Sequence, residues 1–530
     1  MNKRVLFFVF VFNLIIAFGY YFQGLNAKIE DISSDLANII PICKKIDNPS
    51  IYKNDLYLDD INNVKYYTPF FVQSLRFFAK FVNQDYLQAL NLLSFFAHLL
   101  YGIFWFLLFY KLEKNFWIAM IFSLFMRGII WPPGGELLGI SDLWTIMPRT
   151  LYSVFLPIPF LLFSCLNKYR LILASLVLGL IFNFHPITGI GGSILYFSIF
   201  ILFKYFRNEL FLKKSIQEVL IALSFCIIGM IPFLITYFIG VESNLLYDHA
   251  TFKNAFFSRI PRVFSDPLMF VLSWNRPILY LFGLLFLLFY FFDTSKRKIH
   301  FKVLFLSGFI VFISANLSVY IEQIINFIFN KNIRMSFQLI RFQKLIIITF
   351  QIGIFLLFVE FVKRLKLTSK IQFYIFTLYF SVLICSSLSF MSRLPFFGDD
   401  ISTSILPENL KLSSKNQKNY DLSHMIDFIK VNTEKDAVIY GSYLVRAGAD
   451  RAVVLDSKGA GMLIEGNPVK FISWYNELQQ FKSLNTNDKI IFLRNKKVSY
   501  IIDGKPWEGL KPMKTVGNVY LYKINYNERY

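Results

Sequence analysis

Cysteine and histidine are scarce in this sequence of 530 residues, which has four cysteines and five histidines. Cys165, Cys226 and Cys385 lie within apolar runs, and there is no CxxC spacing and no nearby group of histidines. Neither a disulfide framework nor a zinc site is indicated. The glycines of "YGSYLVRAGADR" and "DSKGAGMLIEG" fit neither GxGxxG nor GxxxxGK[ST] in a strand-to-helix setting, which argues against nucleotide binding.

Acidic residues are also few, 34 against 55 lysines and arginines, for a net charge of +21. Such a balance could suggest a nucleic-acid partner. However, much of the Lys and Arg falls in short loops between apolar runs, where it orients a membrane protein. We therefore expect membrane lipid, and no nucleic acid, as a partner.

Apolar residues dominate the chain, which is 55% hydrophobic and 19% aromatic. Several apolar runs approach the ~20 residues that cross a ~30 Å hydrocarbon layer. The first run follows a basic start but lacks a small-x-small cleavage site, so we favour an uncleaved span over a signal peptide. The sequence predicts an α-helical polytopic membrane protein with about eleven spans, near 4–22, 87–110, 116–130, 150–166, 170–184, 188–205, 218–240, 277–292, 301–319, 344–362 and 371–389.

The loop charges predict a topology. With the N-terminus inside, the cytoplasmic loops are "KLEK", "NKYR", "KYFRNELFLKK", "DTSKRKIHFK" and "KRLKLTSK", each rich in Lys or Arg. The outer face then carries the large loop 23–86, the "WPPGGELLGISDLW" loop, the loop 241–276 and the segment 320–343.

The last part of the chain follows a different pattern. Residues 1–389 form the predicted transmembrane domain, and 390–420, rich in Ser, Asn, Lys and Pro, form a linker. From 421 to 530 the pattern predicts an α/β domain on the outer side, with helices at "DLSHMIDFIKVNT" and "PVKFISWYNELQQF". Its expected strands are "DAVIYGS", "RAVVLD", "KVSYIID" and "NVYLYKI".

The loop 23–86 begins with three carboxylates, Glu30, Asp31 and Asp35, just after the first span. A carboxylate there is ordinarily a solvated helix end. This loop, however, exceeds sixty residues, and its apolar stretches are spaced like interfacial amphipathic helices. It can therefore build a pocket at the membrane surface.

This architecture resembles the GT-C class of membrane glycosyltransferases, typified by protein O-mannosyltransferases and the lipid A aminoarabinose transferase. "DNPSIYKNDLY", "MPRTLYSVFLPIPFLLF", "NFHPITGIGGSILY" and "FQLIRFQKLI" look like segments of a poorly characterised bacterial branch. The resemblance implies a polyprenyl-phosphate-linked sugar as donor, an inner (plasma) membrane location, and an outer-face carboxylate for inverting transfer. Asp31 lies nearest that carboxylate's position, although the family often shows Asp followed by Glu rather than Glu30 followed by Asp31. Asp35 is the second candidate, and Asp55 could help to bind sugar, acceptor or metal.

The reaction itself requires certain groups. An attacking hydroxyl must lose a proton, and the leaving phosphate gains negative charge that cations stabilise. Arg341 and Lys344 are the best phosphate ligands because they lie within a helical turn of each other at the start of a span. Cations at span ends also reach lipid headgroups, and a lone histidine is often structural. The other candidate substrate ligands are Arg149, His185, Arg259 and Arg262.

Two other functions stay open at this point, a transporter or flippase of lipid-linked saccharide and a glycan polymerase or ligase. A transporter predicts ionisable residues deep within spans. The residues specify neither a metal site nor a cofactor, and a requirement for a divalent cation stays open. The acceptor, which is a glycan, a lipid or a protein, is not identified.

Overall fold

The computed structural model describes most of the chain. The described residues are 3–66, 68–128, 130–131, 136–137, 146–163, 167–209, 213–239, 246–259, 266–275, 283–284, 287, 298–329, 335–385, 405–412 and 418–524. The predicted span at 277–292 therefore lies almost entirely outside them.

Five helical stretches in the described chain are long and apolar enough to cross a membrane. They are α1 (Lys3–Gly24), α4 (Tyr86–Glu113), α9 (Pro186–Phe206), α16 (Lys298–Phe329) and a continuous stretch made of α17 (Ser336–Leu339), the 3-10 helix η6 (Ile340–Leu345) and α18 (Ile346–Arg364). A sixth is a bent pair, α10 (Lys213–Gly229) followed by α11 (Ile231–Leu234) and a π-helical turn, η5 (Ile235–Ile239), with a bend of 54°. Large apolar side chains such as Phe7 and Phe22 point outward from α1. Such a surface suits hydrocarbon better than water, so these helices support a membrane-embedded protein.

The other predicted spans that are described correspond to shorter helices. α5 (Phe116–Phe125) with η3 (Met126–Gly128) and α19 (Ser369–Cys385) are apolar but shorter than 18 residues. α8 (Lys168–Phe182) is also short, and the predicted span at 150–166 is divided into α6 (Pro148–Phe155) and α7 (Pro157–Leu162). Pro157 at the first position of α7 explains the division, because a proline begins a helix well and interrupts one already under way. By length and composition, five or six of the described helical stretches could cross a membrane. The predicted count of about eleven spans stays a prediction.

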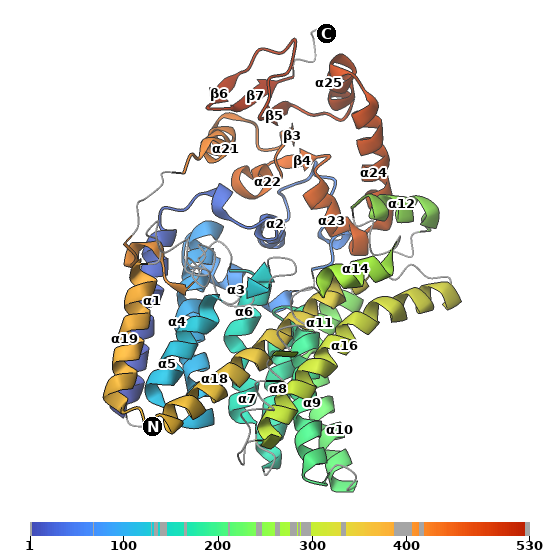
Figure 1. Ribbon diagram of the computed structural model, residues 1–530. Coiled ribbons are helices and arrows are strands. Elements are labelled where there is room, and N and C mark those ends of the chain that lie inside the picture. The colour runs from blue at the N-terminus through green and yellow to red at the C-terminus, as the bar shows by residue number, and fades with distance from the viewer. Residues whose placement is uncertain are drawn as a thin grey trace.

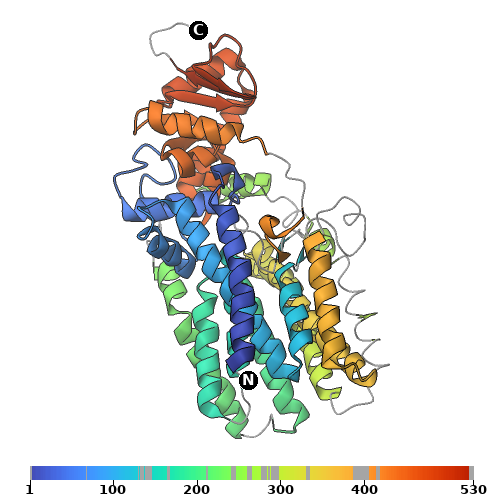
Figure 2. The ribbon, with the colours of Figure 1, turned by 90° about the vertical axis from the view of Figure 1, so that its left-hand side faces the viewer.

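The helical bundle has two distinct ends (Figures 1 and 2). The N-terminus lies at one end, where Lys363 at the end of α18 pairs with Glu113 at the end of α4. The opposite end, called here the domain end, carries the C-terminal domain. Between bundle and domain lie two helices of the 23–86 loop, α2 (Leu36–Asp47) and α3 (Pro69–Ala79), with the 3-10 turns η1 (Ile29–Asp31) and η2 (Ile61–Asn63). Two short helices, α12 (His249–Arg259) and α14 (Pro267–Trp274), lie at the same end.

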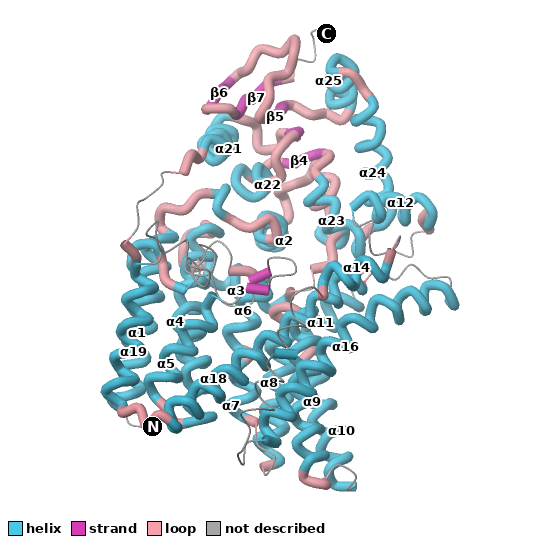
Figure 3. Tube along the Cα trace, viewed as in Figure 1, coloured by secondary structure: helices cyan, strands magenta, loops and turns pink. Residues whose placement is uncertain are grey.

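The C-terminal domain contains a five-stranded mixed sheet of order β4-β3-β5-β7-β6. Strands β3 (Val438–Tyr440), β4 (Ala452–Val454) and β5 (Tyr500–Asp503) are parallel, and β7 (Val519–Lys523) and β6 (Lys514–Val516) are added antiparallel. The other described strands, β1 (Ile130–Trp131) and β2 (Glu136–Leu137), form a short hairpin in the helical part (Figure 3). The predicted α/β pattern is confirmed, with helices α21 (Asp421–Asn432) and α24 (Pro468–Ser483) at the expected places.

Three helices of this domain were not predicted, namely α22 (Leu444–Ala449), α23 (Ser457–Gly466) and α25 (Thr486–Asn495). α22 contains Gly448 and α23 contains Gly459, and both glycines serve close packing. A Cβ at Gly448 would lie 2.6 Å from a side-chain atom of Ile426, and one at Gly459 would lie 2.9 Å from the ring of Tyr57. Small residues at these positions let both helices approach their neighbours.

The bundle and the C-terminal domain share one hydrophobic core. Buried Ile29 and Ile40 of the 23–86 loop belong to the same cluster as Val445 and Ala449 of α22, and this cluster continues into α1 and α4. A short 3-10 turn in the linker, η7 (Glu408–Leu410), also packs on α1, where Asn409 donates to the carbonyl of Gly19. The C-terminal domain is therefore seated on the membrane part rather than tethered to it.

Candidate functional site

Asp35 stands at the start of α2 but does not cap that helix. Its side chain accepts no hydrogen bond from the first turn of α2. Instead, Oδ1 lies 2.7 Å from Nζ of Lys458 on α23, and Oδ2 lies 3.8 Å from a guanidinium nitrogen of Arg149. The Asp35 side chain is 47% exposed, so a ligand could still reach it.

Arg149 is placed by the first turn of α6. Pro148 occupies the first helical position, and the backbone N–H of Met147 donates to Oγ1 of Thr150 at 2.6 Å, which fixes the way the chain enters the helix. Nε of Arg149 is buried without a hydrogen-bond partner among the described residues. This guanidinium therefore has donor capacity left for an anion.

Arg341 and Lys344 lie on η6, which packs against the start of α9. The glycines of "GIGG" make this packing close. A Cβ at Gly191 would lie 2.9 Å from Cβ of Phe342 on η6, and one at Gly192 would collide with the hydroxyl of Tyr152 on α6. These glycines let α9 approach η6 and α6, the two elements that carry the cations.

His185 caps the N-terminus of α9. Its Nδ1 accepts the backbone N–H of Thr188 at 3.1 Å, so in neutral histidine the ring proton is on Nε2. Burial lowers the pKa of His185 well below its usual value, and the positive charges of Lys344, Arg149 and Arg341 add to this effect. His185 is therefore a neutral residue beside three cations, and much of its role is structural, as one of the two interpretations anticipated.

These residues form one group at the domain end, called here the Asp35 cluster. It contains the neutral His185 and five charged side chains, Asp35, Arg149, Arg341, Lys344 and Lys458. Burial by itself would raise the pKa of Asp35, but Lys458, Arg149 and Arg341 together outweigh it and hold that pKa below its usual value. Arg341 also lies over the ring of Trp274, with 5.8 Å between the guanidinium carbon and the ring centroid. Asp35 is consequently ionised at neutral pH and faces an excess of positive charge.

Asp31 lies apart from this cluster and makes structural contacts. It ends η1, and its Oδ2 accepts the backbone N–H of Lys28 at 2.9 Å. Oδ1 lies 3.2 Å from Nζ of Lys418 and 3.4 Å from the hydroxyl of Tyr420, both just before α21. The Asp31 side chain is only 6% exposed. Its neighbour Glu30 accepts the backbone N–H of Ser423 at 2.7 Å, so both acidic residues tie the 23–86 loop to the C-terminal domain.

Asp55 is fully buried in an ion pair. One of its oxygens lies 2.8 Å from Nε of Arg446 on α22, and the same guanidinium reaches Asp456 through Nη2 at 2.6 Å. The other oxygen accepts the backbone N–H groups of Tyr57 and Leu58. We expected Asp55 to help bind sugar, acceptor or metal. In the structure its side chain has no exposed surface and instead joins the loop to the domain.

The side chains of the two remaining predicted arginines lie outside the described residues. Arg262 lies outside the described residues, and Arg259 is the last residue of α12, with its side chain also outside them. Within the described part of the chain, no three His, Cys, Asp or Glu side chains are grouped so that they could hold a metal ion.

One buried charge within the bundle was not anticipated. Arg127, the middle residue of η3, is fully buried. Its Nη2 donates to Oδ1 of Asn13 on α1 at 2.9 Å and to the carbonyl of His98 on α4 at 2.7 Å. The arginine stands alone in an apolar run, which is the signal that would have singled it out. Lys458 was missed for a different reason, because nothing near it in the sequence relates it to residue 35.

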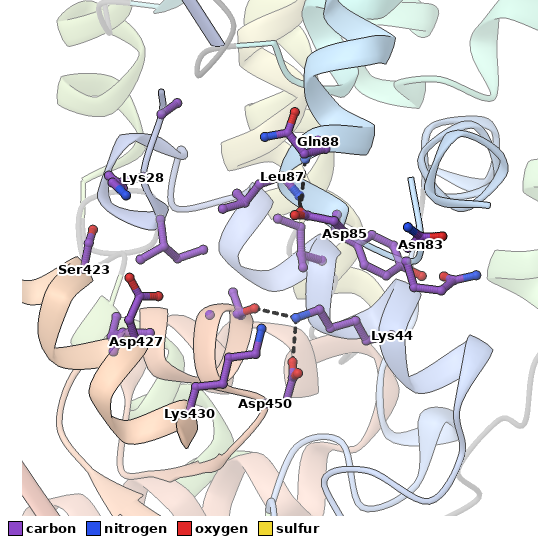
Figure 4. Close-up of a pocket in the computed structure, with 18 of the residues that line it drawn as sticks. Lys28, Lys44, Asn83, Asp85, Leu87, Gln88, Ser423, Asp427, Lys430 and Asp450 are labelled. Carbon is purple, nitrogen blue, oxygen red and sulfur yellow. Dashed lines mark hydrogen bonds and ion pairs between the residues drawn. The ribbon is translucent and has the colours of Figure 1, made fainter. Parts of the chain in front are cut away.

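A cavity of about 740 Å³ lies beside the Asp31 contacts, between the 23–86 loop and α21 and α22. Figure 4 shows its mixed charges, with Lys28, Lys44 and Lys430 among Asp427, Asp450 and Asp85. Lys44 spans the boundary, since its Nζ lies 2.5 Å from Oδ1 of Asp450 and 2.7 Å from the carbonyl of Ala447. Neither Asp31 nor Asp35 lines this cavity.

No family model and no curated protein sequence matches the chain.

Proposed function

We propose that this protein is a membrane glycosyltransferase of the GT-C type, which transfers a sugar from a polyprenyl-phosphate-linked donor to an acceptor at the outer face of the membrane. The observation that carries the proposal is the Asp35 cluster. It combines one accessible, ionised carboxylate with several cations at the ends of apolar helices, where the phosphate of a lipid anchored in the bilayer would lie.

The chemistry assigns a role to each charge. The acceptor hydroxyl attacks the anomeric carbon, a new C–O bond forms, and the bond from that carbon to the phosphate oxygen breaks. The electron pair leaves with the polyprenyl phosphate, and Asp35 takes the hydroxyl proton. Arg149, Arg341 and Lys344 stabilise the charge that develops on the phosphate, through contacts that are strongest when partly desolvated.

Geometry favours Asp35 over Asp31 as the reacting carboxylate. Asp31 is almost buried and engaged by Lys418, Tyr420 and a backbone N–H, whereas Asp35 is half exposed and lies within reach of Arg149. Asp31 was the first candidate from its sequence position alone. We now assign it to anchoring the C-terminal domain.

The arrangement of the bundle supports the proposed topology. The N-terminus and the C-terminal domain lie at opposite ends, and Lys363 of the basic loop "KRLKLTSK" lies at the N-terminal end beside Glu113. With the N-terminus cytoplasmic in a plasma membrane, the Asp35 cluster and the C-terminal domain face outward.

A transporter of lipid-linked saccharide is the second candidate, and Arg127 is the observation that favours it. A buried arginine among helices is typical of a polar pathway. Its contacts with Asn13 and His98, however, link α1, α4 and η3, so they also suit a purely structural role.

A transfer assay distinguishes the two candidates. Purified protein in detergent is given radiolabelled polyprenyl-phosphate sugar and a mixture of envelope glycans, lipids and proteins. The proposal expects label to leave the lipid fraction and polyprenyl phosphate to accumulate. A transporter would leave the donor chemically intact, and would instead move it between leaflets of sealed vesicles.

A further inference from the structure

Lys458 brings the C-terminal domain into direct contact with the candidate carboxylate. Its Nζ lies 2.7 Å from Oδ1 of Asp35. Its backbone carbonyl accepts a hydrogen bond of 3.1 Å from Nδ2 of Asn38, which lies one turn further along α2. Side chain and backbone of one residue thus both hold the first turn of α2. The Lys458 side chain is 27% exposed, so this ion pair is partly shielded from water.

The position of Lys458 is fixed from behind by the buried ion pair. Asp456, two residues earlier, caps α23 by accepting the backbone N–H of Gly459, and it also binds Arg446. Arg446 binds Asp55 of the 23–86 loop. The loop therefore holds the helix that carries Lys458, and Lys458 in turn holds Asp35 of the same loop. The buried ion pairs of Arg446 thus support the partly exposed pair of Lys458 and Asp35.

The two oxygens of Asp35 have different neighbours. Lys458 contacts Oδ1 at hydrogen-bond distance, whereas Arg149 lies 3.8 Å from Oδ2, beyond a direct hydrogen bond. A carboxylate oxygen has two lone pairs, so Oδ2 can still accept a hydrogen bond from a hydroxyl group.

We propose that Lys458 is a positioning residue of the transfer site: it holds Oδ1 of Asp35 so that Oδ2 is presented to the acceptor hydroxyl. This inference rests on the proposed function. It gives the C-terminal domain a defined part in the reaction, since a site that lacks this domain lacks the group that orients its carboxylate.

The test compares Lys458→Met and Lys458→Arg with Lys470→Met. Lys470 on α24 pairs with Asp59 of the same loop at 2.6 Å and lies in no part of the site, so it is the matched control. We expect Lys458→Met to lower kcat by about 10- to 100-fold, as misplacement of a reacting group does. Lys458→Arg should restore part of the rate, and Lys470→Met should leave it unchanged.

The pH profile gives a readout that a purely structural role would not move. The charged and titratable groups around Asp35 are Lys458 on α23, Arg149 on α6, Arg341 on η6 and Tyr443 just before α22. Removing Lys458 removes one of the charges that lower the pKa of Asp35, so the acidic limb of kcat should move to higher pH. An unchanged limb and an unchanged kcat per folded molecule would overturn the proposal.

Failure of the proposed function is distinguishable from failure of this inference. If the wild-type protein transfers no sugar, the function is wrong, but the hold of Lys458 on Asp35 is still measurable from thermal unfolding. The lowered pKa of Asp35 contributes stability that is present at neutral pH and lost as the pH falls through the folded-state pKa. Lys458→Met should reduce this acid dependence in an otherwise wild-type background but not in Asp35→Asn. Equal acid dependence with and without Lys458 would contradict the contact itself.

Discussion

Replacing Arg446 with Met tests how firmly the C-terminal domain is seated. Arg446 is fully buried between Asp55 and Asp456, and it also donates from Nη2 to the carbonyl of Val453 at 2.9 Å. Methionine fills a similar volume but leaves two buried carboxylates without their cation. Removing one partner of a buried ion pair destabilises by about 3–5 kcal/mol, and here two carboxylates lose the same partner.

The assay is limited proteolysis of the detergent-solubilised protein. When opening is fast relative to cleavage, the cleavage rate follows the population of open molecules, and about 1.4 kcal/mol changes that population tenfold. A loss of about 3–5 kcal/mol therefore predicts cleavage roughly 150- to 4,000-fold faster at the boundary between the 23–86 loop and the domain.

The control lies in the same interface. Lys470→Met removes an ion pair that also joins this loop to the domain, but the partners, Lys470 and Asp59, are 26% and 39% exposed. An exposed pair contributes less than about 1 kcal/mol, so cleavage should accelerate by no more than about fivefold. Equal sensitivity of the Arg446 and Lys470 variants would refute the reasoning, because burial would then make no difference.

Three further predictions concern the membrane part and the site. Arg341→Ala should weaken donor binding or raise the barrier to transfer by about 2–4 kcal/mol, because a charge-assisted contact to phosphate is lost from a partly desolvated site. Unchanged donor titrations in a well-expressed variant would mean that Arg341 contacts lipid headgroups and not the donor phosphate. Alkaline phosphatase fused after residue 524 should be active. An inactive fusion would show that the orientation in the membrane is the reverse of the one proposed. Arg127→Met should lower the free energy of unfolding by about 3 kcal/mol or more, because the buried oxygens of Asn13 and His98 lose their donor. Donor turnover per folded molecule should stay constant. A selective loss of lipid-linked saccharide movement between leaflets would instead favour transport.

Much of the helical framework was predictable because apolar length and proline placement are local properties. The same holds for the α/β pattern after residue 421, where alternation in "DAVIYGS" and "KVSYIID" marks β3 and β5. The number of spans was less accessible, because the sequence does not say whether a proline such as Pro157 divides an apolar run into two helices or lies within one span.

The site was predictable in part. Asp35, Arg149, His185, Arg341 and Lys344 were all chosen for lying at helix ends on one side, and the structure groups them at one end of the bundle. The choice between Asp31 and Asp35 was not decidable from the sequence. Both are aspartates in one short segment, and what separates them is a contact with residues almost 400 positions away.

The buried ion pair of Asp55 could not be predicted from the sequence for the same physical reason. Its carboxylate looks like a loop ligand in "YKND", but its partner Arg446 is 391 residues distant in the chain. Long-range ion pairs leave no periodic trace in the sequence, so neither Asp55 nor Lys458 could be assigned from its surroundings.

The proposed mechanism requires Asp35 to take the proton of the acceptor during sugar transfer. The most direct measurement is transfer of radiolabelled sugar from a polyprenyl-phosphate donor by Asp35→Asn, with Asp31→Asn and Asp59→Asn as matched controls in the same loop. Asparagine keeps the size of the side chain and removes its basicity, so Asp35→Asn should transfer at least about 10²-fold more slowly while still binding donor. Asp59→Asn should be unaffected, and Asp31→Asn should lose stability more than rate per folded molecule. Full activity of Asp35→Asn would contradict the account, and loss of activity in Asp31→Asn alone would move the base to Asp31.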